Sequence, residues 1–226
     1  YLPIVAEVIN SESLRDFNIK AWLSLFYVNN RFCLNIDSGD YQTILRDVSK
    51  QLESLDPEGK VRICSDSQRT IDLYSPYFKR QIQCIPIPLA SHNALAKEKH
   101  RDTNEMVIGF CGYTHLKQGY PLVQLLYEEI TRNPAYSHVR FSVRHNVYWL
   151  NHQTLPYIEN LLSSSERITH HIGYFTTNEY ERFLDSCDII LIPHNQNEYP
   201  VQTSGLFVDA LSRGKIVVVP QNTWMS

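Results

Sequence analysis

The second half of the chain alternates short apolar runs with longer segments whose apolar residues recur every three or four positions. The apolar runs predict five strands, at residues 107–111, 139–143, 168–172, 188–193 and 215–220. The segments between them predict four helices, at 121–131, 155–162, 178–187 and 206–212. Strands that alternate with helices in this way are typical of a parallel, doubly wound sheet. We therefore expect a Rossmann-like α/β domain over residues 106–226.

The first half of the chain has a less regular pattern. Apolar residues recur at helical spacing over residues 41–55, which predicts a helix capped by Ser38 or Asp40. Three further elements follow: a strand at 61–64, a helix at 69–77 and an extended segment at 82–89. Because Pro86 and Pro88 interrupt that segment, it is expected at the edge of a sheet. We interpret residues 1–90 as part of another α/β domain and the polar, charge-mixed residues 91–105 as a linker.

Composition narrows the class of protein. The chain has 226 residues, of which 43% are hydrophobic and 20% charged, with a formal net charge of −3. These values exclude intrinsic disorder and fit one or two folded domains. A slightly acidic chain also argues against sequence-independent nucleic-acid binding, which needs a basic surface. No apolar run approaches the roughly 20 residues that span a bilayer.

The cysteines and the paired histidines give no sign of a metal site. None of the five cysteines forms a C-x-x-C pair, so we expect reduced, buried thiols in a cytosolic protein. His170 and His171 are neighbours within a predicted strand and would point to opposite faces. They are therefore not expected to bind one zinc ion together.

Three loops at the carboxyl ends of the predicted strands carry candidate ligand-binding residues. In an open parallel sheet, ligands bind at these ends. The loop at 112–119 contains Gly112, which lets the backbone approach a ligand, and Lys117, which would contact a phosphate. Arg144 ends the next strand and would point into the same cleft. The alternatives are an ordinary strand-to-helix connection and a surface basic pair.

The loop at 194–205 is the strongest candidate for a site. It is long and polar, and long structureless connections are usually functional. Ser204 would cap the following helix, and the N–H groups at Gly205 would form an anion site. The same loop supplies our two candidate catalytic residues, Glu198 and His194. An unoccupied Ser-Gly cap is the alternative.

Three segments in this order resemble the donor-binding half of the GT-B glycosyltransferases. They are the loop with Gly112 and Lys117, the run DIILIP at 188–193 and the segment SGLFVDALSRGKIVVVP at 204–220. The similarity is greatest to the retaining "group 1" enzymes, which use nucleotide-sugar donors. The resemblance implies two Rossmann-like domains, with the acceptor bound by the N-terminal one and the donor by the C-terminal one.

The resemblance also implies roles for individual residues. Lys117 matches the lysine on the donor phosphates, and Ser204 and Gly205 match the helix start beneath the diphosphate. Asp209 matches the second acid of the family's Glu-x7-Glu signature, which bonds the ribose hydroxyls. Val201 stands where the first acid is expected, and Glu198 is the nearest acidic residue. The family's arginine near Gly112 is absent as well, and Arg144 would replace it in space.

The sequence thus predicts a cytoplasmic glycosyltransferase of polysaccharide or glycoconjugate synthesis. Its partners would be a nucleotide-diphosphate sugar and a glycan or lipid-linked acceptor, without a metal ion. Peripheral membrane contact is known among relatives, although no long basic amphipathic helix supports it here. Two alternatives stay open: a GT-B-like interaction module without catalytic activity, and a nucleotide-sugar epimerase.

Overall fold

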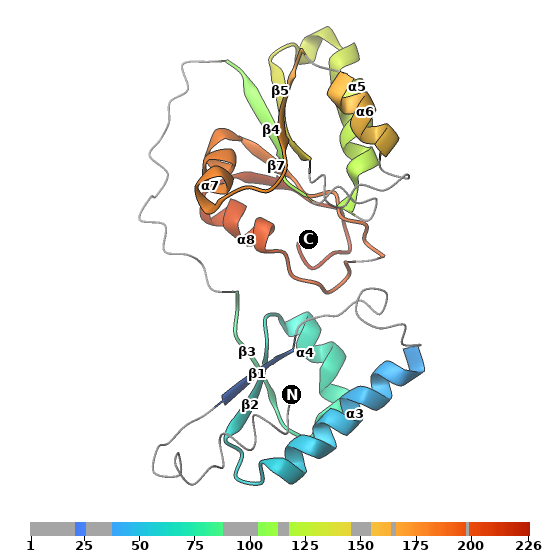
Figure 1. Cartoon of the computed structure of the whole chain (residues 1–226), viewed down its shortest axis with the longest axis vertical. Helices are drawn as coiled ribbons and strands as arrows, with labels where there is room; N and C mark the ends of the chain where they lie inside the picture. Colours follow the sequence, from blue (N-terminus) through green and yellow to red (C-terminus); the bar gives the residue numbers. More distant parts are fainter. Residues whose placement is uncertain are drawn as a thin grey trace. The chain divides into compact units, whose positions relative to one another are not determined.

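A computed structural model describes residues 21–25, 38–87, 104–112, 118–145, 155–163, 166–197 and 199–226. The chain divides into two compact units, residues 1–87 with 201–203 and residues 88–200 with 204–226 (Figure 1). All but the last two residues of the predicted linker at 91–105 lie outside the described residues. Within the described ranges, no helix is long and apolar enough to cross a membrane.

The first unit contains a three-stranded parallel sheet in the order β1-β2-β3. Its strands are β1 (Ala21–Leu25), β2 (Val61–Ser65) and β3 (Ile82–Cys84), and β3 lies at an edge of the described sheet, as predicted. The helices are α3 (Ser38–Leu55) and α4 (Gln68–Tyr74), which continues as a 3-10 turn, Ser75–Tyr77. Residues of both helices form one buried cluster with Ile63 and Ile82, so both helices pack on the same face of this sheet.

A buried ion pair joins the end of α3 to the starts of β2 and β3. Asp56 is 2% exposed, and its carboxylate accepts hydrogen bonds from the backbone N–H groups of Lys60 and Val61 and from Arg80. Burial alone would raise the pKa of the Asp56 carboxyl, but the hydrogen bonds from Arg80 and the two amides outweigh it and lower the pKa. This pair is a structural contact.

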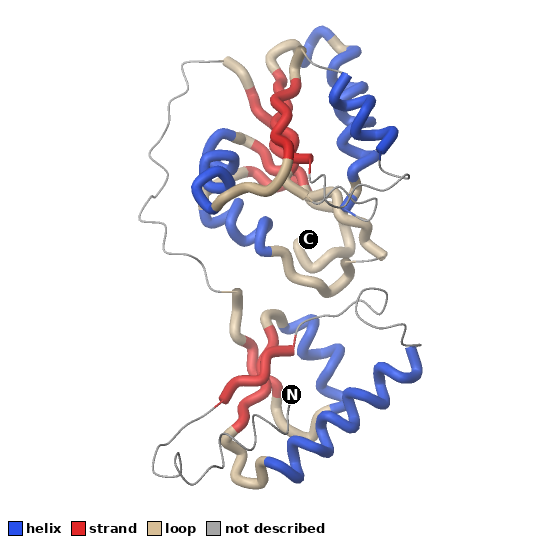
Figure 2. The backbone as a smooth tube through the Cα atoms, viewed as in Figure 1, coloured by secondary structure: helices blue, strands red, loops and turns tan. Residues whose placement is uncertain are grey.

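The second unit contains a five-stranded parallel sheet in the order β6-β5-β4-β7-β8, which confirms the doubly wound fold. Figure 2 shows helices on either side of this sheet. Its strands are β4 (Met106–Phe110), β5 (Val139–His145), β6 (Ile168–Ile172), β7 (Ile189–Leu191) and β8 (Ile216–Val218). The chain builds outward from β4 to β6 and then returns to the other side of β4. The strand order therefore reverses between β4 and β7, and this is the topological switch point.

Helices cover both faces of the second sheet, as the apolar strand pattern predicted. One face carries α5 (Tyr120–Arg132) and α6 (Leu155–Ser163) over a core that includes Phe110 and Phe141. The other carries α7 (Thr177–Ser186) and α8 (Gly205–Ser212) over a core that includes Cys187 and Ile190. Successive strand residues alternate between these two cores.

Two sequence expectations need correction. The strands predicted at 188–193 and 215–220 are shorter, Ile189–Leu191 and Ile216–Val218, because each predicted range runs to a proline, which has no N–H to donate. Cys84 is exposed, although buried thiols were expected, because it ends the edge strand β3. The other described cysteines are buried thiols, and Cys33 lies outside the described residues.

Candidate functional site

The carboxyl ends of β4 and β7 form the most favourable place for a ligand. Cys111 and Gly112 follow β4, and the segment ending in His194 follows β7. Gly119 begins α5 with a φ of 76°, and a Cβ there would lie 2.0 Å from the carbonyl oxygen of Pro193. Only glycine fits this conformation and this approach, so the start of α5 packs directly on the end of β7.

The N-terminus of α8 is capped as the sequence predicted. Ser204 is buried and extended, and its Oγ accepts a hydrogen bond from the Phe207 N–H (3.3 Å). Gly205 is the first helical residue and is exposed, with nothing within 4 Å of a Cβ placed on it. Helical geometry leaves the N–H groups of Gly205 and Leu206 without intrahelical acceptors. This end of α8 can therefore bind an anion.

Asp209 lies one turn into α8 and is half-buried. Its Oδ2 accepts a hydrogen bond from the Tyr180 hydroxyl, at 3.0 Å. Burial, with the Asp209 charge adding to it, raises the pKa of the Tyr180 phenol above its ordinary value. The phenol therefore keeps its proton and acts as the donor.

Arg144 lies beside the end of β4. Its Nε donates to the Gly173 carbonyl (3.0 Å), and its guanidinium stacks on the rings of Phe175 and Tyr174, at 5.1 and 5.7 Å. Burial raises the pKa of the Cys111 thiol to about 11, and the adjacent Arg144 offsets only part of that rise. The Arg144 cation is thus held at the carboxyl edge of β4 and β5, and its contact with a ligand stays a prediction.

His194 is 9% exposed and follows β7. Its ring lies 4.4 Å from that of Tyr199, and in the described structure its Nδ1 is buried without a hydrogen-bond partner. Burial lowers the pKa of His194 to about 4, so the ring is neutral at pH 7. A neutral imidazole can orient a ligand hydroxyl, but it does not provide a positive charge.

Two of the predicted site residues, Lys117 and Glu198, lie outside the described residues, so their roles stay predictions. Gly112 is described, and a Cβ there would lie 2.8 Å from the Phe110 ring, so this position also requires glycine. The structure thus brings Gly112 and Arg144 to neighbouring strand ends, and Asp209 to the first turns of α8. Among the described residues, no three His, Cys, Asp or Glu side chains are grouped as metal ligands.

The sequence analysis missed one hydrogen-bonded network. The Tyr120 hydroxyl bonds to His145 Nδ1, and His145 Nε2 bonds to His170 Nδ1 (2.9 Å). Burial lowers the pKa of His145 to about 4, with smaller effects from the neighbouring His170 and His171. His171 instead bonds to Ser142 Oγ (2.9 Å) on the opposite face, so the two adjacent histidines do not converge. Tyr120 and His145 gave no signal in the sequence beyond their apolar surroundings.

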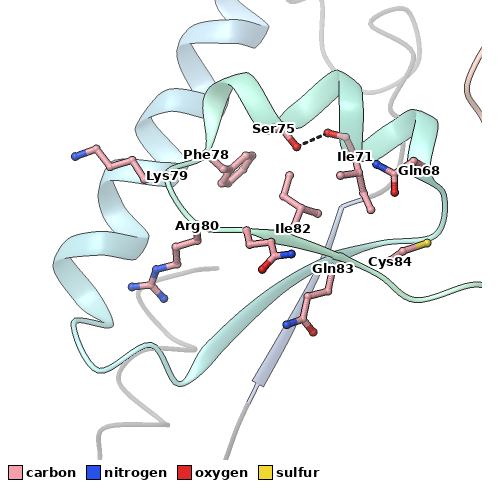
Figure 3. Close-up of a pocket in the computed structure, with 10 residues that line it drawn as sticks. Gln68, Ile71, Ser75, Phe78, Lys79, Arg80, Ile82, Gln83 and Cys84 are labelled. Atoms are coloured by element: carbon pink, nitrogen blue, oxygen red, sulfur yellow. Dashed lines mark hydrogen bonds between the residues drawn. The ribbon is translucent and has the colours of Figure 1, made fainter.

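The described part of the first unit holds a hollow of about 730 Å³ between α4 and β3 (Figure 3). Figure 3 shows Ile71, Phe78 and Ile82 gathered between the helix and the strand, and all three are buried. The remaining lining residues are polar or exposed: Gln68, Ser75, Lys79, Arg80, Gln81, Gln83 and Cys84. None of the residues predicted from the sequence lines this hollow.

Comparison with known proteins shows similarity in structure alone. No family model and no curated protein matches the chain. Among solved structures, Anabaena HepE in complex with UDP-glucose aligns over 91% of this chain with a TM-score of 0.56 and 13% identity. An E. coli structure described as trehalose-6-phosphate bound with UDP-2-fluoro glucose aligns over 99% of this chain, with a TM-score of 0.60 and 12% identity. A glycosyltransferase from Rickettsia africae aligns over 96% of this chain, with a TM-score of 0.61 and 10% identity.

The fold is that of the GT-B glycosyltransferases. The GT-B-like architecture predicted from the sequence is therefore confirmed, while the group 1 assignment and the retaining stereochemistry remain proposals. This chain spans 54%, 57% and 60% of those three chains, respectively.

Proposed function

We propose that this chain binds a nucleotide-diphosphate sugar at the switch point of its second sheet and belongs to a glycosyltransferase. The observation that carries the proposal is the exposed, Ser204-capped N-terminus of α8 beside the carboxyl ends of β4 and β7. A helix N-terminus favours anions, and ligands bind at such switch points. The UDP-sugar complexes of HepE and of the E. coli structure, which share the fold, support the same class of ligand.

The residues of the site match the charge that develops in glycosyl transfer. When the bond between the sugar's anomeric carbon and the diphosphate oxygen breaks, negative charge accumulates on the leaving diphosphate. In our proposal the N–H groups of α8, Lys117 and Arg144 stabilise that charge, so a metal ion is not required. Gly112 lets the backbone approach the diphosphate, and Asp209 accepts hydrogen bonds from the ribose.

The sugar itself would be held by the loop after β7. Glu198 would accept hydrogen bonds from the sugar hydroxyls, and the neutral His194 would orient them. The acceptor hydroxyl would form the new bond to the anomeric carbon and pass its proton to the leaving diphosphate. From the resemblance to group 1 enzymes we further propose retention at that carbon, an acceptor bound by residues 1–90, and a cytoplasmic role in polysaccharide or glycoconjugate synthesis.

Calorimetric titration of the chain with UDP, GDP, ADP and their sugar conjugates tests this proposal. We expect micromolar binding of one base. Lys117→Ala should weaken that binding by about 1–3 kcal/mol, because it removes a charge-assisted contact. Lys50→Ala is the matched control, since Lys50 is exposed and lies on α3 in the first unit. A folded sample that binds none of these compounds overturns the proposal.

One observation favours a second candidate function, a GT-B-like module that binds without catalysing transfer. Val201 stands where the resemblance places the first acidic residue. A module of this kind would bind the nucleotide but give no transfer from any donor when tested within its full-length protein. A nucleotide-sugar epimerase would instead release a modified sugar in the absence of an acceptor.

A further inference from the structure

We infer that Tyr180 is a positioning residue that fixes the carboxylate of Asp209 for the ribose of the nucleotide. The inference rests on the proposed function, because it assigns a role within the same site. Nothing in the sequence resemblance gives Tyr180 a role. The hydrogen bond between its hydroxyl and Asp209 Oδ2, at 3.0 Å, is the observation that carries it.

The direction of this hydrogen bond is fixed. The Tyr180 hydroxyl is held in a largely desolvated position beside a carboxylate, and both conditions oppose loss of the phenol proton. The hydroxyl therefore donates, and Oδ2 accepts. Among the residues that the structure describes, Tyr180 is the one side-chain donor recorded for this carboxylate, which leaves Oδ1 as an acceptor for a ligand.

The rest of the contact between α7 and α8 is independent of this hydroxyl. Arg213, at the end of α8, pairs with Glu181 (3.4 Å) and Asp185 (2.7 Å) of α7. Lys215 donates to the Cys187 carbonyl that follows α7, at 2.8 Å. Because these contacts hold the two helices together near the end of α7, loss of the Tyr180 hydroxyl should free the Asp209 side chain without displacing α8.

The spacing along α8 fits a nucleoside diphosphate. Gly205 and Asp209 are four residues apart, so they lie on the same face of the helix, one turn from each other. A diphosphate bound at the N–H groups of the first turn of α8 places the adjoining ribose beside the second turn, which carries Asp209. The ribose offers two neighbouring hydroxyl donors, and a carboxylate with a fixed plane accepts them better than one that rotates.

The test compares two ligands and three proteins by calorimetry. The ligands are the nucleoside diphosphate that the wild-type chain binds most tightly and its 2′,3′-dideoxy analogue, which lacks both ribose hydroxyls. The proteins are the wild type, Tyr180→Phe and Tyr136→Phe. Tyr136 is an exposed tyrosine at the amino-terminal side of β5, so its variant controls for loss of a hydroxyl elsewhere.

We expect Tyr180→Phe to weaken binding of the ribonucleotide about 3- to 20-fold, because the carboxylate loses its orienting donor. Binding of the dideoxy analogue should stay unchanged in that variant, and Tyr136→Phe should change neither affinity. Equal weakening of both ligands, or no weakening of either, overturns the inference while leaving the proposed function in place. Absence of nucleotide binding by the folded wild type overturns both.

Discussion

Each face of the second sheet holds a polar network that contains a tyrosine, and the two networks end differently. On the α5 side, Tyr120, His145 and His170 bond to one another, and the one atom left over, His170 Nε2, is enclosed by protein in the described structure. On the α7 side, the Tyr180 hydroxyl bonds to Oδ2 of Asp209, a half-buried residue one turn into α8. The first network is suited to stabilising the fold, and the second to binding a ligand.

The direction of the enclosed network can be worked out from its bonds. Burial raises the pKa of the Tyr120 phenol, so its hydroxyl donates to His145 Nδ1. In the tautomer in which the Tyr120 hydroxyl donates, His145 donates from Nε2 to His170 Nδ1, and His170 carries its proton on Nε2. A second proton on His170 Nδ1 would then break its hydrogen bond to His145, and a second proton on His145 Nδ1 would reverse its hydrogen bond to Tyr120. The enclosed network should therefore respond to acid, whereas the Tyr180–Asp209 pair should respond to ligand.

The largest expected effect comes from Gly119→Ala, at the residue that starts the helix carrying Tyr120. The new Cβ would meet the Pro193 carbonyl oxygen and would also be strained at a positive φ. We expect the free energy of unfolding of the second unit to fall by about 3 kcal/mol or more, measured by urea unfolding of the full chain. Gly214 also has a positive φ, but a Cβ placed there would meet open space. Gly214→Ala should therefore lower the free energy of unfolding by only about 1 kcal/mol. Equal losses would contradict the close approach.

The second largest expected effect is the loss of stability at acid pH through the enclosed network of Tyr120, His145 and His170. His145 has a pKa of about 4 in the folded chain, below the value of about 6.5 for an exposed histidine, so the unfolded state binds a proton first as the pH falls. Its contribution, about 3 kcal/mol at most, is therefore complete above pH 6.5 and is lost as the pH falls towards 4. Urea unfolding at stepwise pH should give a shallower slope for His145→Asn than for the wild type. Parallel slopes would show that His145 is not the group responsible.

Tyr120→Phe should mainly lower stability, whereas Tyr180→Phe should mainly lower nucleotide affinity. Tyr120→Phe leaves His145 Nδ1 buried without its donor, so the free energy of unfolding should fall by about 1–2 kcal/mol while nucleotide affinity stays the same. Tyr180→Phe should lower affinity with a smaller loss of stability, because Asp209 is half-buried and keeps access to water. The pair is measured by thermal unfolding and calorimetry together. If folded Tyr120→Phe protein also bound the nucleotide more weakly than the wild type, the enclosed network could not be distinguished from the binding site.

The smallest expected effect is that of the α8 cap. Ser204→Ala removes the acceptor for the Phe207 N–H and should lower the free energy of unfolding by about 1 kcal/mol. Ser204→Gly should lower the free energy of unfolding by only about a few tenths of a kcal/mol, because water can reach the freed N–H group of Phe207. Chemical unfolding of the two variants distinguishes these values, and identical stability of both with the wild type would mean that the cap contributes nothing.

The sequence was sufficient for the second sheet because its strands are apolar on both faces and its helices have a clear period. The strand β1 was not predicted, since the apolar run around it has no clean alternation. Ser204 was found from its cap chemistry, which is local in sequence. Tyr180 lies within the helix predicted at 178–187, but nothing local in the sequence marks its role, because its bond to Asp209 joins residues 29 positions apart. Contacts of that range cannot be derived from spacing along one chain.

Amide hydrogen exchange of the chain, with and without the nucleoside diphosphate that calorimetry selects, tests the central claim most directly. The account predicts slower exchange on binding at Gly205 and Leu206 of α8 and at Gly112 after β4, with no change at Gln81–Cys84 in the hollow of Figure 3. Slower exchange confined to that hollow, or binding that protects none of the amides at the switch point, would contradict it.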